Sequence, residues 1–492
     1  MASFSNDKLA GFVDADELRT KFALAMSAMY RAEVPLYGDL INIVRAINEK
    51  TLDEDSGSKP KDFSAIRTNS ERLTLERHGA IRLGTPYELQ TVRRIFGVLG
   101  MYPIGYYDLS VAGLPMHATC FRPREVSSLD RNPFRVFTTL LRPELLVSEE
   151  ARNLSLELLG QREIFTDKLL EMLSTAELQN GRLTEPQAEV FIPEALLTFS
   201  WRPVAAATFS QYNVLKAEHP ILADVACFQG AHINHLTPRT LDISAAQVAM
   251  QTAGMAVKSR IEGPPRRKCP ILLRQTSFLA LEESVKFRTT DSTGDTTNPL
   301  STDTSLIEAS HKARFGEIEE RGAAVTIKGR ELYDRLLSEG MSRAVGVSPG
   351  QLDSIMEERF KEYPDDWTTL RRERLIYCEF QCTEKNAQNI APEKKGTSLL
   401  EQLITDGVVE ATPITYEDFL PFSAVGIFQS NLQSRGADGA ALVLKQAAPD
   451  LKGLEDSIQT KLMDVDEWYG HAQTQSLKAV CAQLELTMED LT

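Results

Sequence analysis

The sequence predicts an α+β fold, in which helices surround a central β-sheet. Residues 79–84 and 106–111 are short segments with the composition of strands. Between them, Thr85, Pro86 and Glu88 mark the start of a helix, because they supply an N-cap, a proline at the first helical position and the glutamate of a capping box. A strand, a helix and a strand in this order are typical of a sheet covered by helices.

Longer helical segments flank this region. Residues 14–35 repeat apolar side chains at helical spacing, with acids near the start and Pro35 at the end. The patterns of residues 143–200, 328–374 and 451–486 are also mainly helical. Helices are therefore expected at both ends of the chain as well as around the sheet.

The composition argues against several classes of protein. The 492 residues carry a net charge of −15, whereas a surface that binds nucleic acid needs a basic face. No stretch approaches the apolar length that spans a membrane, and the N-terminus lacks the apolar segment of a secretory signal. The six cysteines are scattered, which fits a reduced setting. We therefore expect a cytoplasmic protein with neither nucleic-acid nor membrane partners.

Three of the seven histidines lie in strand-like segments, namely His78, His232 and His235. His232 and His235 are three residues apart, so on a regular strand they face opposite sides and only one can point into a given pocket. Two imidazoles from separate strands and one carboxylate form the ligand set of a non-haem iron site. Glu317 and Glu319, on one face of a predicted strand, are candidates for the carboxylate. Core histidines and a solvated acidic edge are the alternatives.

The other four histidines are expected to have structural roles. His219, His311 and His471 are expected to be surface or capping residues, and His117 is expected to be a core histidine. None of the four lies in a sequence pattern that favours a metal ligand.

Arg82 follows His78 by four residues on the same predicted strand. The two side chains therefore share a face and lie ~13 Å apart, at ~3.3 Å per residue. The planar guanidinium can donate two parallel hydrogen bonds to a carboxylate. A metal at one end and an arginine at the other would suit a short dicarboxylic acid, and an ordinary salt bridge is the alternative.

Five segments together resemble one known family. They are LERHGAIRLGTPYEL (75–89), HINHLTPRT (232–240), ILLRQTSFLALEE (271–283), RFGEIEERG (314–322) and DFLPFSAVGIFQSNL (418–432). In this order they resemble the 2-oxoadipate dioxygenase/decarboxylase family, whose members are also called hydroxyglutarate synthases. The resemblance implies a central β-sheet barrel of vicinal-oxygen-chelate type surrounded by helices. It also implies an Fe(II) enzyme that converts 2-oxoadipate and dioxygen to 2-hydroxyglutarate and carbon dioxide in lysine breakdown.

The resemblance also implies roles for individual residues. The implied Fe(II) ligands are His78, His235 and Glu317, with Glu319 as the alternative carboxylate. The implied substrate-binding residues are Arg82, Phe422 and Ser423, and Arg82 is also the implied catalytic residue. Phe422 stands where we expect a smaller aliphatic residue in the family, so the pocket is expected to differ in shape or length.

The expected organisation follows from the same resemblance. It comprises a catalytic core over residues 1–327 with N-terminal and inserted helices, a mainly helical region over 328–415, a return to the core with a pocket-lining loop over 416–450, and a C-terminal helical segment over 451–492.

Two other functions stay open. One is a metal-dependent lyase or isomerase that needs no dioxygen, and the other is a binding protein for a small dicarboxylate without catalytic activity. No oligomeric state is predicted.

Overall fold

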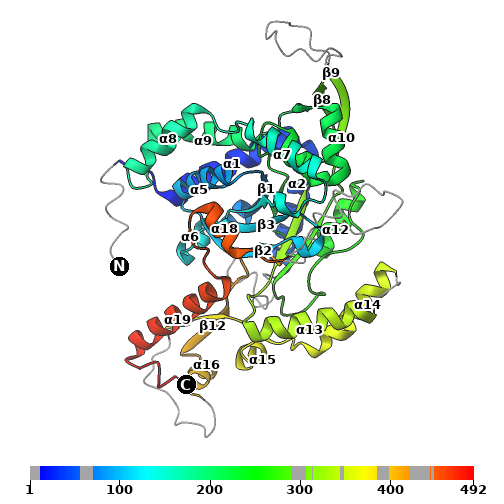
Figure 1. Cartoon of the computed structure of the whole chain (residues 1–492). Coiled ribbons are helices and arrows are strands. Elements are labelled where there is room, and N and C mark those ends of the chain that lie inside the picture. The colour runs from blue at the N-terminus through cyan, green and yellow to red at the C-terminus, as the bar shows by residue number, and fades with distance from the viewer. Residues whose placement is uncertain are drawn as a thin grey trace.

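The structure is a computed structural model that describes residues 11–55, 70–289, 306–312, 314–343, 348–384, 398–420, 444 and 448–491. Helices surround several β-sheets, as Figure 1 shows, and the predicted α+β class is confirmed. Phe422 and Ser423 lie outside the described residues. Within the described residues, no helix is both long and apolar enough to cross a membrane.

The central sheet has five strands. In spatial order they are β2 (Tyr102–Asp108), β3 (Met116–Arg122), β4 (Arg135–Leu141), β1 (Arg77–Leu83) and β6 (His235–Pro238). Strand β1 runs parallel to β4 and antiparallel to β6. Strand β1 therefore lies between β4 and β6, which come from later parts of the chain.

A second pair of strands extends this surface. Strands β7 (Leu273–Ser277) and β10 (Glu317–Arg321) pair antiparallel, and β10 meets the end of β6 through a bridge between Arg239 and Glu319. The described strands form an open set of sheets, and the closed barrel implied by the resemblance is not found among them. The barrel is therefore a correction to the expected fold, whereas the helices around the sheet are as expected.

The remaining strands form two smaller sheets. They are β5 (Val204–Thr208), β8 (Glu282–Arg288) and β9 (Leu306–Lys312) in one sheet, and β11 (Cys378–Cys382) and β12 (Val409–Pro413) in the other. In Figure 1, β8 and β9 lie at the upper end of the molecule and β12 lies in its lower part.

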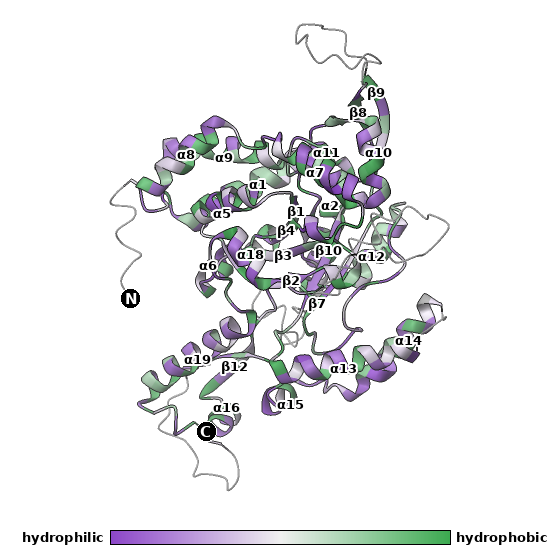
Figure 2. Cartoon of the chain, viewed as in Figure 1, coloured by the Kyte–Doolittle hydropathy of each residue, from purple (hydrophilic) through white to green (hydrophobic). Residues whose placement is uncertain are grey.

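The helices before β7 lie in the upper part of the molecule, around the central sheet and beyond it (Figure 1). They are α1 (Ala15–Glu33), α2 (Pro35–Asp55), α4 (Ser70–Leu75), α5 (Pro86–Val98), α6 (Val126–Arg131), α7 (Glu149–Gly160), α8 (Asp167–Leu178), α9 (Glu185–Phe199), α10 (Phe209–Glu218), α11 (Pro220–Cys227) and α12 (Ile243–Thr252). Most helices in Figure 2 carry both hydrophilic and hydrophobic residues, as expected for helices with one face on a core.

The later helices lie mainly in the lower part of the molecule. They are α13 (Ile327–Arg343), α14 (Pro349–Arg359), α15 (Trp367–Arg372), α16 (Leu399–Thr405), α18 (Leu451–Ile458) and α19 (Val465–Leu484). Of these, α18 packs against α5 beside the central sheet. Helices α13 to α15 fall within the region expected to be helical, although the proposed division into four parts stays a prediction.

The start of α5 follows the predicted pattern in part. The Thr85 side chain accepts from the Glu88 amide at 3.2 Å, and Pro86 is the first helical residue. The Glu88 carboxylate, however, accepts from the Gly84 amide at 2.7 Å instead of from Thr85, and it also binds Arg162. Glu88 thus connects Gly84, just after β1, with Arg162, just after α7.

The two faces of β1 have different roles. Ile81 and Leu83 are buried in the apolar core formed with α1, α2, α5 and α9. His78 and Arg82 alternate with them and point to the opposite face. Gly79 lets β6 approach closely, because a Cβ atom there would lie 2.5 Å from Ile233 and 3.1 Å from Leu236. The alternation of residues in β1 thus places apolar side chains on the face toward the helices and His78 and Arg82 on the other face.

Candidate metal centre

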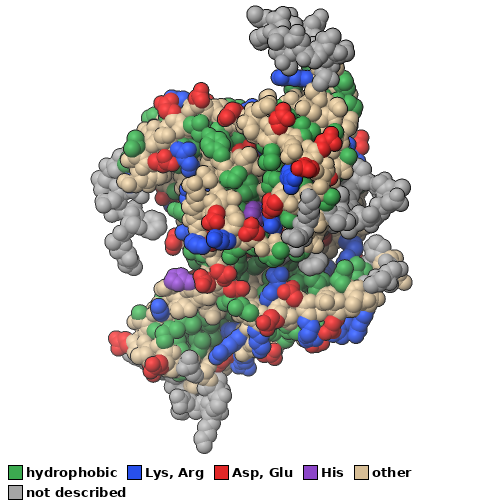
Figure 3. Space-filling model, in the orientation of Figure 1, with side chains coloured by type: hydrophobic (Ala, Val, Ile, Leu, Met, Phe, Trp, Pro, Cys, Tyr) green, Lys and Arg blue, Asp and Glu red, His purple; other side chains and the backbone are tan. Residues whose placement is uncertain are grey.

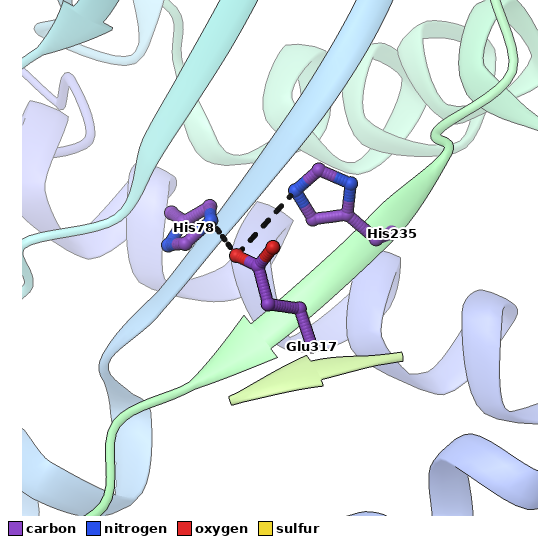
Figure 4. A group of neighbouring side chains, drawn as sticks. All are labelled: His78, His235 and Glu317. Atoms are coloured by element: carbon purple, nitrogen blue, oxygen red, sulfur yellow. Dashed lines mark ion pairs between the residues drawn. The ribbon is translucent and has the colours of Figure 1, made fainter. Parts of the chain in front are cut away.

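Three strands bring His78, His235 and Glu317 together. His78 lies on β1, and its neighbour on the same face, Ala80, pairs directly with His235 on β6. Side chains directly opposite one another in an antiparallel pair share a face, so both imidazoles point to the same side of the sheet. Glu317 is the first residue of β10 and points between them (Figure 4).

The donor atoms of these three side chains converge. One donor atom from each residue can be chosen so that all three lie within 4.8 Å of one another. The Nε2 atom of His78 lies 2.9 Å from Oε1 of Glu317, and Nε2 of His235 lies 4.0 Å from the same oxygen. The imidazole rings are 5.5 Å apart and mutually perpendicular. All three side chains are buried, so the group is shielded from solvent.

The Glu317 carboxylate is only partly satisfied by protein donors. Its Oε1 atom accepts from Thr237 at 3.1 Å and from Gln275 at 2.8 Å. Its Oε2 atom is buried and has no hydrogen-bond partner among the described residues, and the same is true of Nδ1 of His235. Because an unpaired buried carboxylate oxygen is costly, this arrangement suits a cation.

The protonation states follow from burial and from neighbouring charge. Burial alone would raise the pKa of Glu317, but the contact with His78 holds it below its ordinary value, so the carboxyl is ionised. Burial lowers the pKa of His235 to about 3, so this imidazole is neutral near pH 7. Neutral imidazole and ionised carboxylate are the forms that bind metals. The residues present therefore fit a divalent metal ion with oxygen and nitrogen ligands.

Glu319 contacts His78 from the opposite side. Its Oε2 atom lies 2.8 Å from Nδ1 of His78, and Arg321 binds both Glu319 oxygens at 2.7 and 2.8 Å. Arg135 donates to the same carboxylate at 3.3 Å. Glu319 is not part of the converging group. It is hydrogen-bonded instead to Nδ1 of His78, the ring nitrogen that faces away from Glu317. Carboxylates in this position orient a metal-binding histidine and fix its tautomer.

Two phenylalanines enclose the imidazoles. Phe419 packs edge-on against His78 with the ring centroids 4.9 Å apart, and Phe315 stacks on His235 at 4.7 Å. Phe419 is the residue before Leu420, where the described part of this segment ends. These contacts fix the ring planes and surround the donor atoms with apolar groups.

Arg82 lies on the same face of β1 as His78 and is buried. Its Nη1 atom forms a salt bridge with Asp224 of α11. In the amide orientation that satisfies both of its polar atoms, Asn234 accepts from Nη1 of Arg82 at 3.2 Å. The salt bridge that the sequence left as an alternative therefore exists, and substrate binding by Arg82 stays a prediction.

The structure also corrects one histidine assignment. His311 is buried on β9 and lies 2.9 Å from Asp224, although the sequence predicted a surface or capping residue. His219 does cap α11, as expected, because its Nδ1 accepts from the Ile221 amide. His232 lies 3.3 Å from Asp224, away from the converging group, so only His235 of the two points into that group.

Other residues of the site lie outside any sequence pattern that indicates a metal centre. Thr237 and Gln275 bind Glu317, and Asp224 binds Arg82, yet each stands in an otherwise ordinary strand or helix segment. The alternation of β6 and the pairing of β7 with β10 place the first two beside the carboxylate. Such residues become recognisable only when the strand register is known.

Comparisons with known proteins give consistent matches over most of the chain. A sequence model of the family described as 2-oxoadipate dioxygenase/decarboxylase matches residues 22–431. A 2-oxoadipate dioxygenase/decarboxylase of Pseudomonas putida is 44% identical over 479 residues, which cover 96% of this chain and 97% of that protein. The protein of the same name from Escherichia coli K12 is 47% identical over 429 residues, 86% of this chain and 90% of that protein.

The solved structures agree with these matches. The crystal structure of the hydroxyglutarate synthase from Pseudomonas putida, in complex with 2-oxoadipate, superposes with a TM-score of 0.82 at 39% identity. The superposition covers 97% of this chain and 100% of that one. The similarity thus extends to the whole architecture around the His78, His235 and Glu317 group.

Proposed function

Because the chain belongs to the 2-oxoadipate dioxygenase/decarboxylase family, we propose that it converts 2-oxoadipate and dioxygen to 2-hydroxyglutarate and carbon dioxide. The observation that carries this proposal is the buried convergence of His78, His235 and Glu317, in which one oxygen of Glu317 has no donor within the described part of the chain. The 2-oxoadipate bound to the Pseudomonas putida relative supports the choice of substrate. The reaction balances, because the six carbons of the substrate appear in a five-carbon product and in carbon dioxide.

We propose Fe(II) as the metal and His78, His235 and Glu317 as its ligands. Bound there, Fe(II) would supply a redox-active Lewis acid with coordination positions left for a 2-oxo acid and dioxygen. The protein's part is to present a neutral imidazole at His235 and an ionised carboxylate at Glu317. Glu319 would keep the Nδ1 proton of His78 on the side away from the metal, so that Nε2 faces Glu317.

We propose that Arg82 binds the carboxylate of the substrate that lies far from the metal. Arg82 is on the His78 face of β1, and its charge is close enough to contribute to the low pKa of His235, after burial and the effect of His78. A guanidinium at this place would orient a dicarboxylic acid along the strand and hold its 2-oxo end at the metal ligands. Phe315 and Phe419 would exclude water from the reacting end.

Phe422 and Ser423 complete the proposed pocket. Both follow Phe419, which touches His78, within a few residues of sequence, although both lie outside the described residues. We propose that Ser423 contacts the substrate and that the larger Phe422 side chain limits the length or shape of acid that fits.

We also propose a cytoplasmic location. All six cysteines are described and none forms a disulfide, which is usual for proteins kept under reducing conditions. The face of the molecule in Figure 3 intersperses acidic and basic side chains.

Product identification tests the proposal. Purified protein loaded with Fe(II) is incubated with 2-oxoadipate in air and under nitrogen, and the products are separated and identified. The proposal predicts 2-hydroxyglutarate in air only. Turnover under nitrogen would instead support the lyase or isomerase, and tight binding of 2-oxoadipate without any product would support the binding protein.

A further inference from the structure

A second group of buried polar side chains lies around Asp224. We call Arg82, Asp224, His232 and His311 the Asp224 cluster; they come from β1, from α11, from the segment before β6 and from β9. All four side chains are buried, with at most 4% of each residue exposed. No metal-binding arrangement involves Asp224 among the described residues, so this cluster is distinct from the candidate metal centre.

Asp224 is bound by Arg82 and His311 and has His232 as a close neighbour. Its Oδ2 atom accepts from Nη1 of Arg82, its Oδ1 atom lies 2.9 Å from Nε2 of His311, and the same oxygen lies 3.3 Å from Nε2 of His232. Burial alone would raise the pKa of Asp224, but Arg82 and then His232 hold it well below its usual range, so the carboxyl is ionised. A charged carboxylate with both oxygens engaged is a rigid partner for an arginine.

The two imidazoles are themselves fixed. Nδ1 of His311 lies 3.1 Å from the hydroxyl of Tyr212, and the His311 ring is stacked on Trp201 with an interplanar angle of 5°. His232 packs edge-on against the same tryptophan at 4.7 Å. Trp201 and Tyr212 therefore fix the histidine rings, and His311 in turn binds Asp224.

The cluster is connected to the candidate metal centre through Arg82. Asn234, which binds Nη1 of Arg82, is the residue before His235. The guanidinium thus lies between Asp224 on one side and the strand that carries a metal-ligand candidate on the other. An arginine side chain has many rotamers, and fixing it before the substrate arrives removes much of the entropic cost of binding.

We propose that Asp224, bound by His311 and packed beside His232, is a positioning residue that fixes the Arg82 guanidinium for the far carboxylate of the substrate. This inference rests on the proposed function, in which Arg82 binds that carboxylate. Guanidinium has five donors in a plane and one carboxylate engages at most two, so an arginine can serve Asp224 and a substrate carboxylate on different edges. Asp224 therefore contributes to the preference for dicarboxylic over monocarboxylic 2-oxo acids.

The test compares 2-oxoadipate with 2-oxohexanoate, which has the same chain length but no second carboxylate. In Asp224→Asn the side chain keeps its size and loses its charge. We expect kcat/KM for 2-oxoadipate to fall at least tenfold, mainly through KM, while kcat/KM for 2-oxohexanoate and the iron content stay unchanged. Calorimetric binding of 2-oxoadipate under nitrogen is expected to weaken by the same factor, which gives a readout independent of turnover.

Variants of His311 keep the test decisive if Asp224→Asn does not fold. His311→Leu removes one hydrogen bond to Asp224, and we expect a severalfold loss of the preference for 2-oxoadipate. His311→Gln can still donate to Asp224, and we expect it to restore most of that preference. Glu282→Gln, an acid-to-amide change at an exposed position on β8, is the matched control and is expected to leave both substrates unaffected.

Two results would overturn the inference. One is an equal loss for both acids, which would mean that Asp224 serves only the stability of the fold. The other is an unchanged preference in Asp224→Asn or in His311→Leu. Failure of the proposed function gives a different result, because wild-type protein would then form no 2-hydroxyglutarate from 2-oxoadipate, and the inference would fall with it.

Discussion

Replacing Glu319 tests whether the carboxylate behind His78 tunes the metal site. In Glu319→Gln the side chain keeps its shape, but the charge that holds Nδ1 of His78 at 2.8 Å is lost. Removing such a partner typically weakens metal binding 10–100-fold, which corresponds to about 1.4–2.7 kcal/mol. We therefore expect Fe(II) to bind Glu319→Gln about 10–100-fold more weakly than wild type.

The same change is expected to cost stability. Glu319 is fully buried and is paired with Arg321 and Arg135. Breaking a buried ion pair by removing one partner costs about 3–5 kcal/mol, because the remaining charge loses its counter-ion. Arg135 retains Glu76 and Glu417 as partners, so we expect the loss to lie near the lower end of that range.

The assay is anaerobic titration with Fe(II) against a competing chelator, followed by urea unfolding of the metal-free proteins. Glu320→Gln is the matched control, because Glu320 is the next residue of β10 and points to the other face, where it binds Arg274 and the Ile243 amide. The control is expected to bind iron like wild type. Wild-type affinity in a folded Glu319→Gln protein, or an equal loss in Glu320→Gln, would refute the reasoning.

Three further predictions concern the ligands, the pocket and the pH dependence. His235→Ala is expected to lose iron binding altogether, and full iron occupancy measured by elemental analysis would show that the ligand assignment is wrong. Phe422→Val is expected to shift the preferred chain length in a panel of 2-oxo diacids, and an identical profile would show that Phe422 does not border the substrate. Burial and then Arg142 lower the pKa of His117 to about 4, so the folded protein resists protonation there. The stability that this histidine contributes is present above its unfolded pKa of about 6.5 and is lost as pH falls toward 4, by up to about 3 kcal/mol. In His117→Gln, urea unfolding between pH 7 and pH 4 is expected to show a shallower pH dependence than in wild type, and an equal dependence would contradict the assignment.

Much of the local structure could be predicted from the sequence. The Thr85 cap, Pro86 and the apolar spacing after them define α5 because these signals act between neighbouring residues. The alternation of β10 placed Glu317 and Glu319 on one face, and both indeed reach His78. His232 and His235 do point to different places, as predicted, although His232 lies before β6 and not on the regular strand that the prediction assumed.

The assembly of the site could not be predicted from spacing. Glu317 follows His78 by 239 residues in the sequence. The two residues come together only because β1 pairs with β6 and the end of β6 pairs with β10. The resemblance to a family supplied that set, and the donor atoms of the three side chains converge in the structure, although their role as ligands stays a prediction. It also implied a closed barrel, which the described strands do not form.

Asp224 and His311 show what local patterns miss. Asp224 stands within the otherwise apolar helix Pro220–Cys227, and His311 follows a polar stretch, so neither position indicates burial. Both are buried because α11 and β9 pack together with β1 around Arg82. A buried charge of this kind depends on partners that are distant in sequence.

The most direct test of the central claim is the stoichiometry of the reaction with isotopically labelled dioxygen. Iron-loaded protein is given 2-oxoadipate, and dioxygen consumed, carbon dioxide released and 2-hydroxyglutarate formed are counted together. We predict equal amounts of all three, label from dioxygen in the organic product, and no reaction in Glu317→Ala. Formation of 2-hydroxyglutarate without consumption of dioxygen, or at the wild-type rate in Glu317→Ala, would contradict the account.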